Sequence, residues 1–191
     1  MHRAICYRIV STLEAHHLVT RTGDGRIRLG AGTAVLAGRF EPQLLHATGP
    51  VLQQLAEQTG ATAHLSVASG EECVVVRVAE PDDPAIRVSY RVGSRHPLTS
   101  GAAGVAILAA RPERAGDDAR VTTARRLGYA VTQGELERGA IGIAAGVVRL
   151  AGPGPAPGAS VGVVAIDGLD VERAAAAVVR AADELGNVAS S

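Results

Sequence analysis

Residues 2–30, HRAICYRIVSTLEAHHLVTRTGDGRIRLG, contain the pattern that decides how the N-terminal part of this chain folds. Ile5, Ile9 and Leu13 recur every four residues, which predicts an amphipathic helix with one apolar face. The following run, VTRTGDGRIRLG, places a Gly-Asp-Gly turn between two short extended segments, and the second segment alternates arginine with aliphatic residues. A helix followed by a basic hairpin is the second half of a winged helix-turn-helix, whose helix enters the major groove while its hairpin meets phosphates.

The charge distribution agrees with an N-terminal end that binds nucleic acid. The chain has 19 basic and 19 acidic residues, so its formal net charge is zero. Residues 1–39 carry six arginines against Glu14 and Asp24, a balance of +4, and the remaining residues carry a balance of −4. This asymmetry indicates a basic end that meets a polyanion and a remainder that does not.

Composition and cysteine usage exclude several classes of protein. The 191 residues are 47% apolar, which allows one packed domain with a small appendage. No apolar run approaches the ~20 residues of a membrane-spanning helix and no secretory leader is recognisable, so we expect a cytoplasmic protein that does not enter membranes. Cys6 and Cys73 have no second cysteine or histidine at metal-ligand spacing, so we predict no disulfide, no metal and no cofactor.

The rest of the chain predicts an α+β domain with a mainly antiparallel sheet. Helices are expected over residues 31–40, 41–60 (with a break or kink near Pro50), 101–110, a short segment ending near 127, and 171–185. Strands are expected over residues 61–68, 73–79, 86–92, 129–132, 141–150 and 159–166, with a Gly/Pro hairpin connection at 152–158. The expected organisation is a partial winged helix-turn-helix over 1–30, a linker helix over 31–46 and a second domain over 47–191.

The N-terminal pattern is similar to the DNA-binding domain of the isocitrate lyase regulator (IclR) family of bacterial transcription factors. That family has a Tyr-Arg pair on its recognition helix, a leucine-valine exit and a glycine-rich wing. Here Tyr7-Arg8, Leu18-Val19 and the run from Arg21 to Gly30 match these features in order. His17 stands where the family usually has glycine, and Ile27 where it usually has tyrosine.

The resemblance implies a set of contacts with double-stranded operator DNA. They would come from Arg3, Ala4, Tyr7 and Arg8 on the recognition helix and from Arg26 and Arg28 on the wing. For Tyr7 the alternative is a core or interface aromatic, and for the wing arginines it is an ordinary solvated hairpin face. The family has two further helices before the recognition helix, so the resemblance implies an N-terminally truncated member.

Three later blocks extend the resemblance and imply a GAF-like effector-binding domain. They are the helix from Pro50 to Gly60, the run PLTSGAAG at 97–104, and the residues from Gly128 to Ala145. The pocket that the resemblance implies is lined by Ala102, Ala103, Thr132, Ala140, Gly142, Ala165 and Asp167. Several of these residues stand where the family usually has other polar side chains, so fewer hydrogen-bond donors remain and we expect a roomy pocket. A bulkier or more apolar acid fits it at least as well as glyoxylate or pyruvate.

Residues 101–104, Gly-Ala-Ala-Gly, suggest an anion site independently of any family. They form the predicted start of a helix with almost no side-chain bulk, so the backbone N–H groups and the positive end of the helix dipole are accessible to a small carboxylate. The alternative is that Ser100 caps a helix whose small residues permit tight packing.

The sequence thus predicts a transcriptional regulator whose operator affinity is controlled by a small organic acid, working as a homodimer or homotetramer. The alternative is an effector-binding module that has lost DNA binding through truncation. An enzyme is not expected, because no nucleophile–base pair or carboxylate dyad can be identified. His64 and Glu135 are the only candidates for catalysis, and a core or structural role is favoured for both.

Overall fold

The computed structural model describes residues 3–37, 42–82, 90–148, 158–166 and 168–188, without the side chains of residues 42–47 and 188. The chain divides into two compact units, Met1–Pro42 and Gln43–Ser191. We call them the first and the second unit and describe each by itself. The boundary predicted at residue 47 lies inside a helix, α3 (Pro42–Thr59).

The first unit is a helix, a hairpin and a short second helix. Its elements are α1 (Arg3–Ala15), β1 (Val19–Arg21), β2 (Ile27–Leu29) and α2 (Gly32–Ala37). The two strands pair antiparallel, with Val19 opposite Leu29, around the predicted Gly-Asp-Gly turn. No residue of α1 is buried, and its apolar stripe stays open, with Ile5 50% and Ile9 47% exposed. The predicted helix and hairpin are therefore present.

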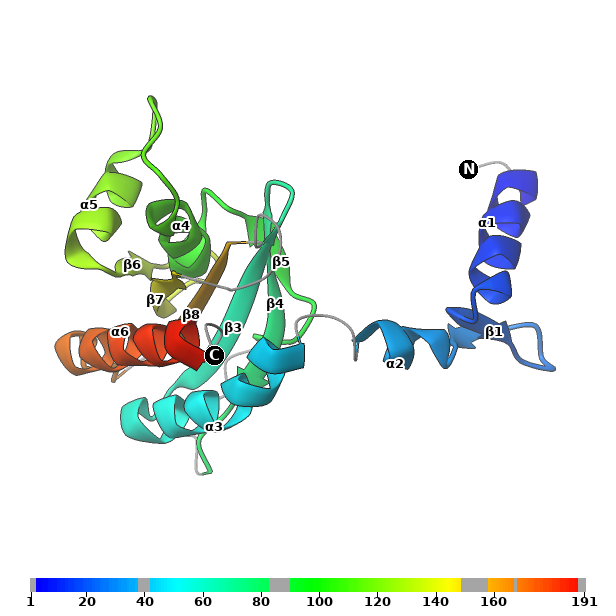
Figure 1. The fold of residues 1–191 in the computed structure, drawn as a ribbon, viewed down its shortest axis with the longest axis horizontal. Coiled ribbons are helices and arrows are strands. Elements are labelled where there is room, and N and C mark those ends of the chain that lie inside the picture. Colours follow the sequence, from blue (N-terminus) through cyan, green and yellow to red (C-terminus); the bar gives the residue numbers. More distant parts are fainter. Residues whose placement is uncertain (1–2, 38–41, 83–89, 149–157, 167, 189–191) are drawn as a thin grey trace. The chain divides into compact units, whose positions relative to one another are not determined.

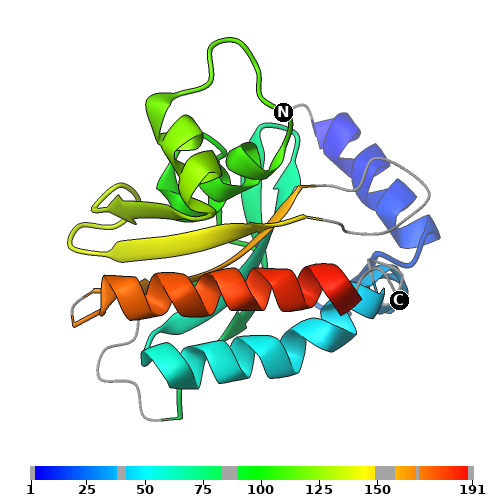
Figure 2. The same cartoon turned by 60° about the vertical axis from the view of Figure 1, so that its left-hand side comes forward.

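The second unit is a six-stranded antiparallel sheet with helices on both faces (Figures 1 and 2). The strand order is β5-β4-β3-β8-β7-β6. The strands are β3 (Thr62–Ser69), β4 (Glu72–Ala79), β5 (Arg95–Pro97), β6 (Ala130–Gln133), β7 (Ile141–Val147) and β8 (Ala159–Ala165). The helices are α3, α4 (Gly101–Ala110), α5 (Ala119–Leu127) and α6 (Val171–Val188). The predicted α+β class with a mainly antiparallel sheet is confirmed.

One face of this sheet, which we call the apolar face, packs against α3 and α6. Successive strand residues point to opposite faces, and the odd-numbered residues of β3 up to Val67 and those of β8 are aliphatic. Leu65 and Val163 are fully buried here, together with Leu52 of α3 and Leu185 of α6. In Figure 2 the two helices run side by side across this face. The main apolar core of the unit lies between these helices and the sheet.

The opposite face, which we call the polar face, is covered by α4 and carries buried hydroxyl and imidazole groups. These groups are Thr62, His64 and Ser66 of β3, Thr132 of β6 and Ser160 of β8. Helix α4 approaches the sheet closely: a Cβ added at Gly146 would lie 2.4 Å from Ala110 Cβ and 2.8 Å from the Ala106 carbonyl oxygen. Only glycine fits at this crossing.

The structure differs from the predictions at several places. Helix α3 continues through Pro50, so the chain does not break there; the exposed proline costs one backbone hydrogen bond, and the helix is continuous on both sides of it. Strand β5 was not predicted. Most of the strand predicted over 86–92, and the hairpin connection over 152–157, lie outside the described residues, and residues 90–92 are not in a strand. Strand β7 ends at Val147, three residues before its predicted end.

No helix within the described part of the chain combines the length and the apolar character that a membrane-spanning helix needs.

Candidate functional site

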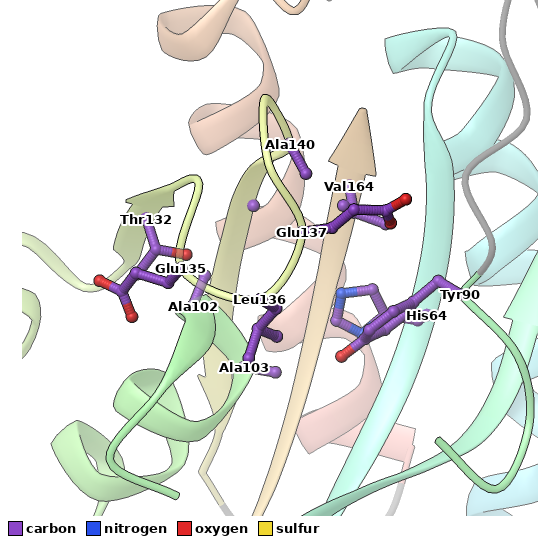
Figure 3. A pocket seen from close by; sticks show the side chains of 11 residues that line it. His64, Tyr90, Ala102, Ala103, Thr132, Glu135, Leu136, Glu137, Ala140 and Val164 are labelled. Atoms are coloured by element: carbon purple, nitrogen blue, oxygen red, sulfur yellow. The ribbon is translucent and has the colours of Figure 1, made fainter. Parts of the chain in front are cut away.

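A cavity of about 200 Å³ opens on the polar face, between the N-terminal end of α4 and the strands (Figure 3). The loop 134–140, which joins β6 to β7, forms one of its walls. A hydrogen bond from the Gly134 N–H to the Ala140 carbonyl oxygen, 2.8 Å long, closes this loop at its base. The lining residues are His64, Tyr90, Ala102, Ala103, Thr132, Glu135, Leu136, Glu137, Ala140, Gly142 and Val164.

Five of the seven pocket residues expected from the family resemblance line this cavity. They are Ala102, Ala103, Thr132, Ala140 and Gly142. Ala165 does not line it, because it alternates onto the apolar face of β8 and packs against the core there, whereas its neighbour Val164 points into the cavity. Asp167 lies outside the described residues.

The N-terminus of α4 already holds a carboxylate from this chain. Ser100 makes no side-chain capping bond; the N–H of Gly101 instead donates to Glu135 Oε2 at 2.9 Å. Arg120 donates to the other oxygen of Glu135, also at 2.9 Å, and to the carbonyl oxygen of Thr99. Glu135 thus takes the place of the serine cap considered as the alternative, and it puts an ion-paired carboxylate at the positive end of the helix dipole.

The opposite side of the cavity is formed by His64 and Tyr90, which the sequence did not indicate as pocket residues. Their rings meet edge to face with centroids 4.7 Å apart. The Ser66 hydroxyl lies 3.2 Å from His64 Nδ1, and the Tyr90 hydroxyl lies 3.2 Å from His96 Nε2. His96 Nδ1 is 3.0 Å from the Pro97 carbonyl oxygen, so this nitrogen carries the proton and Nε2 accepts from Tyr90.

Burial shifts the titration of these groups towards their neutral forms. It lowers the pKa of His64 to about 3, with a smaller contribution from His96, so His64 is neutral at pH 7. Burial also raises the pKa of Tyr90 well above its ordinary value and that of Cys73 to about 11. This side of the cavity therefore offers neutral hydrogen-bonding groups next to apolar walls.

His64 and Glu135, the two residues considered for catalysis, both have hydrogen-bond partners within this chain. Glu135 is committed to the Gly101 N–H and to Arg120, and His64 is held by Ser66. Both residues are thus held by other groups of the second unit. Within the described residues, no three histidine, cysteine, aspartate or glutamate side chains come together as a metal site.

In the first unit, the residues expected to contact DNA are exposed. Arg3, Ala4, Tyr7 and Arg8 lie on α1, and Arg26 and Arg28 lie on or beside β2. Tyr7 is 54% exposed, which contradicts the alternative of a core aromatic. The Arg21 guanidinium lies 4.8 Å from the centre of the Tyr7 ring and pairs with Glu14 at 2.9 Å, a contact between helix and hairpin that the sequence did not reveal.

Comparison with known proteins relates the chain to one group of regulators. Residues 41–122 match the family model described as bacterial transcriptional regulator IclR C-terminal. The HTH-type transcriptional regulator TtgV of Pseudomonas putida is 29% identical over 133 residues, which make up 66% of this chain and 51% of TtgV. The match therefore spans about half the length of this curated relative.

Solved structures share the fold over almost the whole chain. An IclR transcriptional regulator from Alicyclobacillus acidocaldarius superposes with a TM-score of 0.79 at 23% identity, covering 99% of this chain and 86% of that one. An IclR homologue from Microbacterium hydrocarbonoxydans, solved in complex with 4-hydroxybenzoate, gives a TM-score of 0.76 at 21% identity and covers 100% and 87%. These relatives are described as transcriptional regulators or their homologues, not as enzymes.

Proposed function

We propose that this chain is a member of the IclR family and a DNA-binding transcriptional regulator whose affinity for its operator is controlled by a small organic acid. The acid would bind in the cavity of the second unit. The observation that carries the proposal is that cavity, which opens beside Ala102 and Gly142, where the family resemblance implied an effector pocket. The proposed place of action is the cytoplasm, where operator DNA is found.

The size and walls of the cavity support a small guest with an apolar body. Its volume of about 200 Å³ lies below the ~300–1,000 Å³ of pockets for drug-sized ligands, so it is smaller than the roomy pocket expected from the sequence. Leu136, Val164 and three alanines provide apolar surface, and Thr132, Tyr90 and His64 provide hydrogen-bonding groups. The aromatic acid 4-hydroxybenzoate in the Microbacterium homologue has this character, so we propose aromatic and other compact carboxylic acids as effectors.

The first unit supplies the proposed contacts with DNA. Arg3 and Arg8 are exposed on α1, and Arg26 and Arg28 are exposed on the hairpin, so all four guanidinium groups are accessible to a polyanion. Backbone phosphates are the main partners of such side chains, and a helix of this kind enters the major groove. Operators recognised by this geometry are two-fold symmetric, and we therefore propose that the protein acts as a homodimer or homotetramer.

A gel-shift titration tests the DNA-binding half of the proposal. The probe is the intergenic DNA upstream of the coding sequence, and the proteins are this chain and a form extended by the in-frame upstream codons. We expect binding that weakens steeply with salt. Arg28→Ala should weaken binding and reduce the slope of log K against log salt by about one, as for one lost phosphate contact. Arg173→Ala, which removes an exposed arginine of α6 in the second unit, is the matched control and should leave the slope unchanged.

Thermal unfolding in the presence of small acids tests the effector half. Pyruvate, benzoate and 4-hydroxybenzoate are suitable probes, and a bound acid raises the unfolding temperature as its occupancy rises. Acids that bind should then change the affinity for DNA in the gel-shift assay, because a ligand that prefers one state of the protein also shifts the DNA-binding equilibrium. Binding of acid without binding of DNA by either form would favour the alternative, an effector-binding module without DNA-binding activity.

A further inference from the structure

The charges around the cavity are unfavourable for an anionic guest. Glu135 and Glu137 both line it, and Glu135 is paired with Arg120 and with the start of α4. The chain contains no lysine, and none of the described lining residues is an arginine. Among these lining residues, His64 is the one whose side chain can take a positive charge.

The start of α4 offers less to a carboxylate than the sequence suggested. The N–H of Gly101 is occupied by Glu135, and Gly101 itself is held with φ at +73° in a place where an added Cβ would lie 2.6 Å from Leu136 Cδ1. A second carboxylate at this helix end would meet the charge of Glu135 at close range. An acid group is therefore better placed on the far side of the cavity, at strand β3.

We propose that the acid group of the effector lies against His64, not at the N-terminus of α4, and that binding adds one proton from solvent to this imidazole. The effector remains a carboxylate, so the reaction is protein plus anion plus proton giving a complex with a buried imidazolium–carboxylate pair. This inference rests on the proposed function, since it requires that an acid binds in the cavity.

His64 is built to accept this proton without losing its support. The residue is only 3% exposed and lines the cavity, and its Nδ1 contacts the Ser66 hydroxyl. A hydroxyl both donates and accepts, so Ser66 can bond to the neutral ring through its own hydrogen and to the protonated ring through its lone pairs. The contact is therefore compatible with both protonation states.

The groups around His64 determine whether its pKa rises or falls when an acid binds. Tyr90 packs on its ring, His96 lies beyond Tyr90, Cys73 pairs with His96 across β4 and β5, and α4 contributes only glycine and alanine at its start. Glu135 and Glu137 come from the loop 134–140. In the free protein, burial holds the pKa of His64 far below neutral; a buried carboxylate beside the ring favours the charged form and raises that pKa.

Two measurable consequences follow for the wild-type chain. Acid binding should take up protons from solvent, and the affinity should fall as the pH rises through the raised pKa of His64 in the complex. Isothermal titration calorimetry with 4-hydroxybenzoate, repeated in buffers of different ionisation enthalpy, measures the number of protons. 4-Hydroxybenzamide, which has the same shape without the charge, should bind with no proton uptake.

Variants assign the proton to one residue. His64→Gln keeps a hydrogen-bonding side chain that cannot be charged, and we expect it to bind 4-hydroxybenzoate at least tenfold more weakly, with no proton uptake. The matched control is His96→Gln, which alters the neighbouring histidine outside the cavity lining and should retain the uptake. As a readout that does not depend on the folding of His64→Gln, wild-type protein labelled with ¹⁵N-histidine should show one imidazole changing from neutral to protonated shifts when acid is added.

The possible results separate this inference from the proposed function. Acid binding without proton uptake, or with all histidines remaining neutral, overturns the role of His64 but leaves an acid-binding regulator. Uptake that persists in His64→Gln places the proton on the acid itself or on another residue, and also overturns the assignment. If pyruvate, benzoate and 4-hydroxybenzoate all fail to bind, the proposed effector class fails and the inference fails with it.

Discussion

The two faces of the sheet in the second unit are held to their helices by different means. On the apolar face, α3 and α6 bury large aliphatic side chains such as Leu52, Leu65 and Leu185. On the polar face, α4 approaches the sheet through glycine and alanine, Val105 and Ile107 are buried in a smaller apolar cluster, and polar contacts fasten its two ends. Glu135 holds its first N–H, and Arg125 donates to the carbonyl oxygens of Leu108 and Ala109 near its C-terminus.

This difference shows how one sheet provides both stability and a binding site. Burial of apolar area is the main source of folding free energy, and the apolar face supplies most of it. The polar face can then hold hydroxyl and imidazole groups and leave space open beneath α4, because the fold does not depend on filling that space. The following predictions test this division, beginning with the largest expected effect.

Neighbouring residues of β3 should differ sharply on truncation. Leu65 points to the apolar face and Ser66 to the polar face, and both are fully buried. Leu65→Ala should lower the free energy of unfolding by about 2–5 kcal/mol, whereas Ser66→Ala, which removes one hydrogen bond to His64, should cost about 1 kcal/mol. Urea denaturation of both variants measures the difference. Equal losses would contradict the division between the faces.

Two glycines of β7 should respond differently to a methyl group. Gly146→Ala places a Cβ against Ala110 and the backbone of α4 and should destabilise the protein by about 1–3 kcal/mol. Gly142→Ala meets Thr132 Oγ1 at 3.4 Å and Ala102 Cβ at 3.5 Å, which are ordinary contacts, so its stability should be nearly unchanged. Thermal unfolding compares the two. A large loss of stability for Gly142→Ala would contradict the prediction that there is room for a methyl group beside Gly142.

The C-terminal attachment of α4 should make stability depend on pH. Asp117 pairs with Arg111 and, at 2.9 Å, with Arg125, and these hydrogen bonds lower its pKa from 3.8 to about 2. Its contribution is thus fully present above pH 4 and is lost as the pH falls towards 2. Asp117→Asn should be less stable than wild type at pH 7, and the gap should close between pH 4 and pH 2 in urea titrations. A gap that is constant with pH would exclude the charge as its cause.

The contact of Glu135 at the N-terminal end of α4 should contribute the least to stability. Glu135→Ala removes the carboxylate that accepts from the Gly101 N–H, a loss comparable to that of a helix cap, about 0.5–2 kcal/mol. Glu135→Gln keeps an acceptor at this position and should retain much of the stability. Thermal melts of the two variants separate the hydrogen bond from the charge, and identical melts would assign the whole effect to the charge.

The sequence predicted most of the fold because its strongest signals are local. The period-two segments around the Ser69-Gly70-Glu71 turn and the helix before Pro112 appear as β3, β4 and α4. Strand β5 has only three residues and includes Pro97, so it has no recognisable period. The continuity of α3 through Pro50 depends on packing against the sheet, which outweighs the local penalty of the proline.

The site was predictable only as far as the family pattern reached. Ala102, Thr132 and Gly142 occupy blocks that match the family, and they line the cavity. Both faces of β8 are buried, so its sequence shows no alternation that could distinguish Val164 from Ala165. Non-local contacts left no local signal: Glu135 caps a helix 34 residues away, and Tyr90 reaches His64 from a segment 26 residues away.

The cavity walls come from several separate stretches of chain, which together span residues 64–164. A molecule held there ties these stretches to one another, and by mass action it lowers the fraction of time in which the unit is open. Proteases attack mainly the open form, so protein with a ligand in the cavity should be degraded more slowly than protein without one. The lifetime of this protein in the cell, and therefore its amount, would then rise with the concentration of the ligand.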